Sequence, residues 1–293
     1  MNSNIKIPQN RYFNKNFEEC IQRFLSRQVN FAKFKEINFS YLFNLPLIIE
    51  RDNELKIRIN EDIDKFKWDK NFLDSVEKRK RQIITKLKNG GYNIENFSLV
   101  VSWRLIIGLG TSHPQETSMT LHHIYGIPYI PGSAIKGVTR HWAVLKFTEK
   151  FAEQNKKDKF DKIIENVAKA LEEGKDLNIA VDGVEFKDLI NIFGTQKQQG
   201  EVIFFDAYPI ENINLKIDIM NPHYSRYYSG ELPPTDWQNP VPIKFLTVEN
   251  TKFQFHLASK KENLLNKAKN LLLEALKNYG IGAKTSLGYG LFK

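Results

Sequence analysis

The sequence predicts an α+β fold with the ferredoxin-like (RRM-like) order strand, helix, strand, strand, helix, strand. Three observations support this prediction: β-branched and aromatic runs mark the strands, helical spacing of apolar residues marks the helices, and long polar segments separate them. The six elements are expected at residues 98–107, 132–147, 201–208, 252–259, 262–279 and 287–292.

The first three elements have clear boundaries in the sequence. The strand at 98–107 is rich in β-branched and aromatic residues and is followed by Gly108 and Gly110. The helix at 132–147 begins directly after a proline, with Ser133 as a candidate cap. The strand at 201–208 is apolar except for Asp206, for which we favour the role of a structural hydrogen-bond acceptor over a functional group.

The last three elements follow from periodicity. Phe253, Phe255 and Leu257 alternate on one face of the strand at 252–259. Leucines and alanines recur at helical spacing over 262–279. Leu287, Tyr289 and Leu291 then have the period of two that is typical of a strand, so the chain is expected to end inside the sheet.

Other segments lie outside these elements. Residues 1–97 are expected to form an N-terminal helical extension, because apolar residues have helical spacing over 11–35 and 69–87. The run Lys78 to Arg81 within it either contacts phosphate or forms a solvated helix face. Residues 149–190 are expected to be a helical insertion, and residues 213–242 a projecting loop or hairpin.

Composition limits the class of protein. The chain has 293 residues with 41% hydrophobic content, enough to bury a core, and no apolar run or leader that would indicate a membrane or secreted protein. A single cysteine, Cys20, excludes an internal disulfide and a multi-cysteine zinc site, so we expect no metal, no cofactor and a cytoplasmic location. The net charge of +9 favours an acidic partner, most commonly nucleic acid.

The glycine-rich segment after the last helix is the first candidate binding site. Gly280, Gly282 and Gly288 can adopt positive φ, so the backbone N–H groups between them can turn toward one anion. Lys284, Thr285 and Ser286 add a positive charge and two hydroxyl donors, which suits a phosphate. The alternative is a simple turn, and the absence of a Walker motif gives no support to a nucleotide triphosphate site.

The start of the helix at 132–147 is the second candidate. Lys136 and Arg140 are four residues apart and therefore share one helix face, next to Ser133 and the free N–H groups of the first turn. The alternative is an ordinary capped helix with solvated bases.

The proline-rich segment 218–242 is the third candidate. Its prolines exclude a regular sheet core, and its aromatic residues suit a loop that stacks against nucleobases, although packing within the protein or against a partner is a close alternative. The candidate residues are Tyr224, Arg226, Tyr227, Tyr228 and Trp237.

Several of these segments resemble the RAMP superfamily of CRISPR-associated proteins. The similar motifs are Ile130–Arg140, Ile192–Gly194, Val202–Pro209 and Gly280–Gly290. Two further motifs, Asp218–Tyr224 and Asp236–Ile243, resemble more narrowly the family of the sixth subunit of the Cmr complex, the type III-B RNA-targeting effector. The resemblance covers about residues 98–293.

This resemblance implies a ferredoxin-like RAMP domain over 98–293, with a hairpin thumb at 213–242. It implies an RNA-binding subunit that holds the 3′ part of the guide RNA and its paired target RNA, beside other RAMP subunits and the small helical subunit of the complex. By position, Lys136 and Arg140 on the first helix would hold guide phosphates, as would Gly282, Lys284, Thr285 and Ser286 in the glycine-rich loop. Arg226 and the aromatic residues of 224–237 would lie in or beside the thumb.

Catalysis is not expected from this comparison. Relatives that cut target RNA use an aspartate in the loop after the first strand, whereas the corresponding loop, 108–126, contains only Glu116. Two alternatives remain open: a metal-independent guide-processing endoribonuclease that uses His113, His122 or His123, or a general RNA-binding assembly module. Because His122 and His123 are adjacent, on a strand they would face opposite ways and could not act as a pair.

Overall fold

A computed structural model describes most of the chain. The described residues are 38–44, 48–51, 54–57, 64, 66–111, 113, 117–154, 159–221, 230–231, 233, 240 and 242–293. Helices and antiparallel sheets are mixed along the chain, so the α+β class is confirmed. Among these residues, no helix has both the length and the apolar character needed to cross a bilayer.

The main sheet is built around β11 (Lys252–Ser259). It lies between β3 (Asn93–Val100) and β7 (Val202–Phe204), and β8 (Tyr208–Pro209) also pairs with it. The expected alternation is confirmed, because Phe253, Phe255 and Leu257 are all buried. Just after β3, the C-terminal end of the chain joins the edge of the sheet through an antiparallel β-bridge between Val101 and Phe292.

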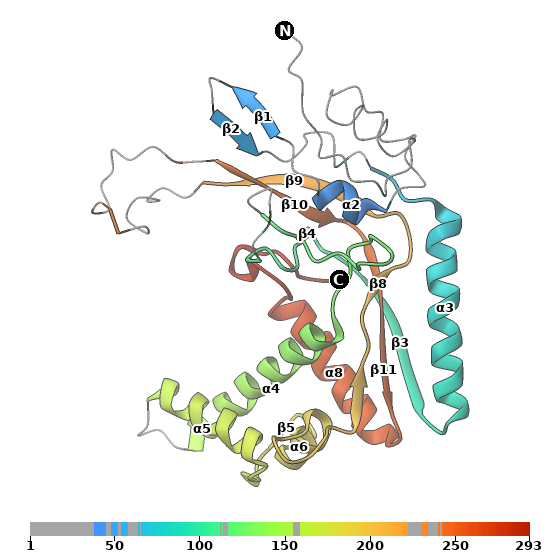
Figure 1. Cartoon of the computed structure of the whole chain (residues 1–293). Helices are drawn as coiled ribbons and strands as arrows, with labels where there is room; N and C mark the ends of the chain where they lie inside the picture. Colours follow the sequence, from blue (N-terminus) through green and yellow to red (C-terminus); the bar gives the residue numbers. More distant parts are fainter. Residues whose placement is uncertain are drawn as a thin grey trace.

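Two long helices, α4 (Gly132–Gln154) and α8 (Glu262–Asn278), cover one face of this sheet, while α3 (Lys70–Asn89) lies on the other side (Figure 1). Their apolar faces meet the buried residues of β11 in one core. α5 (Phe160–Glu173), α6 (Phe186–Phe193) and the short hairpin of β5 (Ala180–Val181) and β6 (Val184–Glu185) pack around α4.

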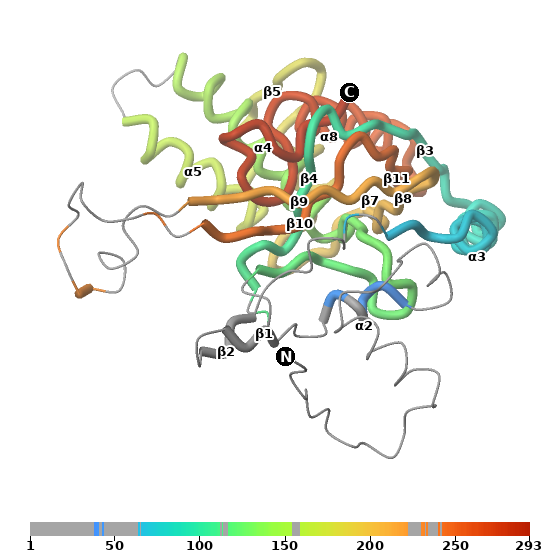
Figure 2. The backbone as a smooth tube through the Cα atoms, turned by 90° about the horizontal axis from the view of Figure 1, so that it is seen from above, coloured from blue at the N-terminus to red at the C-terminus, as the bar shows by residue number. Residues whose placement is uncertain are grey.

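A second sheet has the order β4 (Arg104–Leu105), β10 (Ile243–Glu249), β9 (Asn214–Met220). β9 and β10 pair along their whole lengths, from Asn214 with Glu249 to Met220 with Ile243. They run outward side by side from the body of the molecule, away from α3 (Figures 1 and 2). The sequence did not predict β9, because the prolines of the neighbouring segment masked its short apolar pattern.

Three expected strands differ from the structure. The strand expected at 98–107 is two strands in two sheets, because the chain bends at Ser102 and Trp103 between β3 and β4. The strand expected at 201–208 is interrupted between β7 and β8, around Asp206. The strand expected at 287–292 is wrong in its first part: residues 285–287 form a 3-10 helix, because Lys284, Gly288 and Gly290 have positive φ.

The N-terminal region contains α2 (Phe39–Asn44), an antiparallel pair of β1 (Ile48–Arg51) and β2 (Glu54–Ile57), and α3. The expected helix at 69–87 is confirmed as α3, capped by Asp69, whose carboxylate accepts from the N–H of Asn71 at 2.7 Å. The helix expected at 11–35 lies outside the described residues.

Lys80 attaches α3 to the main sheet. Its ammonium group donates to the backbone oxygens of Asp206 at 3.0 Å and Gln254 at 3.3 Å and lies 5.0 Å from the ring centre of Tyr208. Burial lowers the pKa of Lys80 to about 8, against the opposing influence of Asp206 and Glu77. Lys80, the third residue of the Lys78 to Arg81 run, therefore faces inward and is structural, whereas Lys78, Arg79 and Arg81 are exposed.

The close approach of α4 to β7 gives a stability prediction. A Cβ at Gly132 would lie 2.3 Å from the backbone oxygen of Phe204, so Gly132→Ala must push the helix start off the strand. We expect a loss of about 1–3 kcal/mol in the free energy of unfolding, measured by urea denaturation. Gly137→Ala on the same helix is the control: nothing lies within 4 Å of its Cβ, so we expect a gain of about 0.5–1 kcal/mol. Equal effects of the two substitutions would contradict this packing.

Candidate nucleic-acid interface

The glycine-rich loop is held tightly against β4. The N–H of Ala283 donates to the oxygen of Ile106 at 2.9 Å, and the N–H of Gly290 donates to the oxygen of Arg104 at 2.7 Å. Cβ atoms at Gly282 and Gly290 would overlap backbone oxygens at 2.3 and 1.9 Å. These two glycines are therefore required for close packing as well as for positive φ.

Four backbone N–H groups of this loop remain available. Of residues 280–290, all of which the structure describes, Gly280, Ile281, Ala283 and the segment 287–290 donate to oxygens of the chain. The N–H groups of Gly282, Lys284, Thr285 and Ser286 have no such acceptor. These are the four loop residues predicted from the sequence, so the loop retains donors for an external acceptor.

The charge at this loop comes from Lys284. Its backbone is left-handed, with φ of 61° and ψ of 29°, and its ammonium group lies 5.3 Å from the ring centre of Phe245 on β10. The side chain is half-buried, and Ser286 beside it is exposed. No carboxylate pairs with Lys284 in the described part of the chain, so its charge is available to an anion.

The start of α4 differs in part from the prediction. Ser133 is not the cap, since the helix begins at Gly132 and the oxygen of Pro131 accepts the N–H of Ala134 at 2.9 Å. The carboxylate of Asp206 accepts the N–H of Gly132 at 2.7 Å. The prediction that Asp206 is a structural acceptor is confirmed, and its negative charge already occupies part of the helix terminus.

The two bases of α4 have different surroundings. Lys136 is half-buried, and burial and then the charge of Arg140 lower its pKa, as expected for two bases on one helix face. Arg140 forms an ion pair with Glu172 of α5 at 3.2 Å. A phosphate at Arg140 would therefore compete with a carboxylate, whereas no ion pair of Lys136 occurs among the described residues.

The two candidate phosphate sites lie at the same end of the helix pair (Figure 1). The rings of His141 on α4 and Tyr279, at the end of α8, are 4.9 Å apart between centroids. Tyr279 leads directly into the glycine-rich loop, and His141 follows Arg140. The end of α8 therefore packs against α4 one residue beyond Arg140.

A network around Arg104 connects the loop to the β9–β10 hairpin. Its guanidinium group pairs with Asp218 on β9 and with Glu249 on β10, and the hydroxyl of Tyr289 donates to Asp218. Burial opposes ionisation of Asp218, but hydrogen bonds from Tyr289, the N–H of Ile219 and Arg104 hold its pKa below the ordinary value. This network was not predicted, because its members are scattered along the sequence.

The histidines of the loop 108–126 all pack against other rings. Residues 123–125 form a turn rather than a strand, so the expectation that His122 and His123 face opposite ways is wrong: their rings stack with centroids 5.1 Å apart and planes at 11°. Stacked rings present faces, not nitrogen atoms, to each other. His113 lies against Phe43 instead, with centroids 4.6 Å apart.

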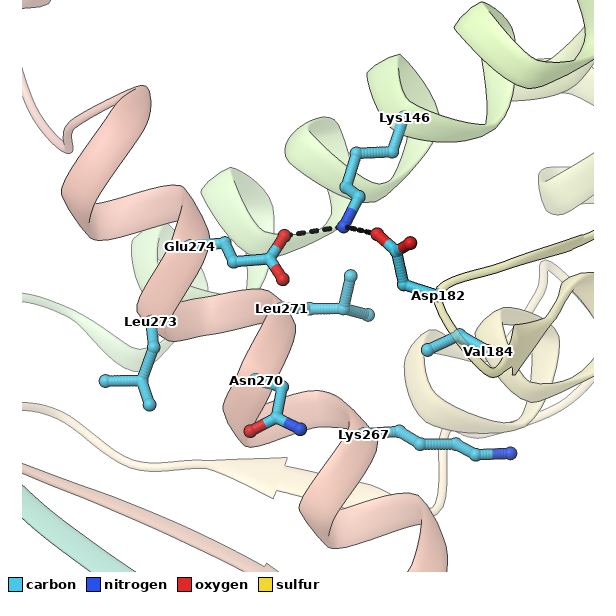
Figure 3. A pocket seen from close by; sticks show the side chains of 8 residues that line it. All are labelled: Lys146, Asp182, Val184, Lys267, Asn270, Leu271, Leu273 and Glu274. Carbon is cyan, nitrogen blue, oxygen red and sulfur yellow. Dashed lines mark hydrogen bonds and ion pairs between the residues drawn. The ribbon is translucent and has the colours of Figure 1, made fainter.

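A cavity of about 340 Å³ lies between α4, α8 and the β5–β6 hairpin (Figure 3). Lys146 projects into it and lies 2.6 Å from both Asp182 and Glu274. Its other lysine, Lys267, pairs with Asp188 at 2.6 Å. Because carboxylates already neutralise both lysines, this cavity suits a phosphate less well than the exposed loop does.

Other predicted residues are not placed. Tyr224, Arg226, Tyr227, Tyr228 and Trp237 lie outside the described residues. Within the described ranges, no group of three or more His, Cys, Asp or Glu side chains could hold a metal ion.

Comparison with known proteins identifies relatives. A family model described as the RAMP superfamily matches residues 100–293. The CRISPR system Cmr subunit Cmr6 of Pyrococcus furiosus is 44% identical over an alignment 220 residues long, and the match covers 64% of this chain and 64% of that protein. The match thus spans slightly less than two thirds of that relative. The CRISPR system CMR subunit Cmr6 of Saccharolobus solfataricus is 28% identical over an alignment 288 residues long, and the match covers 90% of this chain and 85% of that protein.

Two solved structures are also similar. The crystal structure of Cmr6 from Pyrococcus furiosus has a TM-score of 0.48 at 36% identity and covers 69% of this chain and 97% of that chain. A chain of the cryo-EM structure of the type III-B Cmr-beta complex bound to cognate target RNA has a TM-score of 0.53 at 24% identity, covering 97% of this chain and 92% of that chain. The second comparison shows a shared fold.

The Arg104 network gives a prediction of pH-dependent stability. A carboxylate with a depressed pKa stabilises the fold above its unfolded pKa of about 4, and this contribution is lost as the pH falls through the lower folded value. Asp218→Asn should therefore cost about 2 kcal/mol of unfolding free energy at pH 7 and less at pH 3, measured by urea denaturation. Glu211→Gln, in the surface ion pair with Lys252, should change it by less than about 0.5 kcal/mol. A pH-independent cost for Asp218→Asn would exclude this role of the charge.

Proposed function

Because this chain belongs to the RAMP superfamily, we propose that it is a non-catalytic RNA-binding subunit of a type III-B CRISPR effector complex, acting in antiviral defence. The similarity to two Cmr6 subunits supports this assignment. In this proposal the chain holds the 3′ part of the guide RNA and its duplex with target RNA. Its partners are other RAMP subunits and the small helical subunit of the complex.

The observation that carries the proposal is the set of unused donors in the glycine-rich loop. Gly282, Lys284, Thr285 and Ser286 offer backbone N–H groups beside an ammonium group that has no carboxylate partner in the described chain. Such a set of donors binds the phosphate backbone without reading the base sequence. That property suits a subunit that must accept guides of any sequence.

The bases at the start of α4 extend this contact in the proposal. Lys136 provides a second charge, and Arg140 binds phosphate when it exchanges Glu172 for the RNA. Ser133, which is exposed beside them, contributes a hydroxyl donor rather than a helix cap. Since both sites lie at one end of α4 and α8, successive phosphates of one strand reach both.

We further propose a ferredoxin-like assignment for the RAMP domain. With the chain end bridged to Val101, the sheet order is chain end, β3, β11, β7, which corresponds to the order 4-1-3-2 of that fold. Residues 1–97 are an N-terminal extension that runs into the first half of β3. Residues 149–190 are an insertion that starts in the last turns of α4. β9 and β10 are the base of a thumb that contacts the duplex through Arg226 and through the aromatic residues Tyr224, Tyr227, Tyr228 and Trp237.

The proposed phosphate contacts predict a change in salt dependence. Lys136→Ala and Lys284→Ala should each weaken binding of single-stranded RNA of any sequence. Each should also flatten the slope of log K against log salt concentration by roughly 0.7 per lost phosphate contact. Fluorescence anisotropy over a series of salt concentrations measures both quantities. Lys169→Ala, on the exposed face of α5, is the control and should leave the slope unchanged.

The Arg140 ion pair allows a sharper version of this test. Glu172→Ala removes the carboxylate that competes for Arg140, so it should strengthen RNA binding, while Arg140→Ala should weaken it. If neither substitution changes the affinity, Arg140 has no phosphate contact. If the slope is also unchanged in Lys136→Ala and Lys284→Ala, the proposed phosphate sites are wrong.

A further inference from the structure

The turn at residues 121–126 displays a short column of stacked rings. His122 lies 5.1 Å from His123 with planes at 11°, and 4.3 Å from Tyr125 with planes at 19°. His123 is exposed, whereas His122 and Tyr125 are half-buried. The column therefore ends in an aromatic ring at the surface, with its other members supported from below by Tyr129 and Tyr208 at 5.5 and 5.7 Å from His122.

Two residues of the N-terminal region hold this turn in place. The side-chain amide of Asn38 donates to the oxygens of Ile124 at 2.8 Å and His123 at 3.4 Å, and the indole N–H of Trp68 donates to the oxygen of Gly126 at 3.2 Å. Gly126 has a φ of +60°, and a Cβ there would lie 2.0 Å from the Asn38 side chain. The ring column is therefore preorganised before any ligand binds.

Backbone connections link the same turn to the segments that carry the candidate phosphate sites. The N–H of Thr120 donates to the oxygen of Ile107 at 2.7 Å, and the N–H of Ala283 in the glycine-rich loop donates to the adjacent oxygen of Ile106. On its other side, the turn leads through Tyr129 into Gly132 at the start of α4. The rings themselves lie against α3, since Tyr125 contacts Phe72 with ring centroids 6.3 Å apart.

We propose that the column formed by His123, His122 and Tyr125 is a stacking site for an unpaired nucleobase of the bound RNA. This inference rests on the proposed RNA-binding function and adds to it a contact with a base. A flat ring face, exposed at one end and rigid beneath, matches the π-face of any base and requires no particular sequence. Burial, and then the charge of His123, lower the pKa of His122, which is consistent with a neutral stacked ring. In this role, Asn38 and Trp68 are positioning residues.

The test compares RNA with and without bases. The probes are a fluorescein-labelled oligoadenylate of about twelve nucleotides, within the usual site sizes for single strands, and an abasic RNA of equal length. The full chain should bind the oligoadenylate more tightly than the abasic RNA. His123→Ala should reduce this preference roughly fivefold, the lower end of the range for one stacked base, without changing the salt slope. His123→Tyr should restore the preference, because it replaces the ring.

Control variants separate this inference from the proposed function. Ile124→Ala, on the same turn and 62% exposed in the native chain, should leave the preference for bases unchanged. Lys284→Ala should flatten the salt slope and keep the preference. An unchanged preference in His123→Ala, or a failure of Tyr to restore it, would overturn the stacking site while leaving the phosphate contacts intact. If the native chain binds neither probe, the proposed function itself fails. Thermal unfolding of each variant confirms that the fold is retained.

Discussion

The segment 104–107 is the constraint on which the interface depends. Its backbone oxygens accept hydrogen bonds from two other segments: Gly290 and Ala283 of the glycine-rich loop donate to Arg104 and Ile106, and Thr120 donates to Ile107. Buried carbonyl groups of this kind must be paired, so the glycine-rich loop and the segment before the histidine turn cannot move independently of β4. The Arg104 side chain also connects this segment to the β9–β10 hairpin, because it forms ion pairs with Asp218 and Glu249. One short strand thereby fixes the relative positions of phosphate donors, aromatic rings and the base of the projecting hairpin.

Internal carboxylates limit how the positive charge of the chain can be used. The carboxylate of Asp206 accepts a backbone N–H at the start of α4. Two further carboxylates form ion pairs, Glu172 with Arg140 and Glu274 with Lys146. Lys136 and Lys284 are the candidate bases without an ion pair in the described chain. RNA affinity should therefore depend on a few unpaired charges and on backbone donors rather than on the net charge of +9.

The site could be predicted in part because its chemistry is local in the sequence. Glycines that flank a lysine and two hydroxyls identified the loop, and the spacing of Lys136 and Arg140 identified the helix face. Contacts between distant residues could not be predicted: Glu172 is one helix away from Arg140, and Asn38 and Trp68 reach the histidine turn from the N-terminal region. The stacking of His122 and His123 was also missed, because adjacent residues face opposite ways only on a strand, and these lie at the start of a turn.

The sequence by itself determined the α+β class, the two long helices and the central strand β11, because apolar periodicity over many residues reflects which face is buried. It also determined the RAMP resemblance, through short motifs around glycines. Only the tertiary structure decided where strands end and which sheet they join. The run at 98–107 bends at Trp103 and divides between two sheets, and the last residues turn at Lys284, Gly288 and Gly290 before they reach the sheet edge. Strand propensity describes a single segment, whereas pairing and positive φ depend on partners far away in the chain.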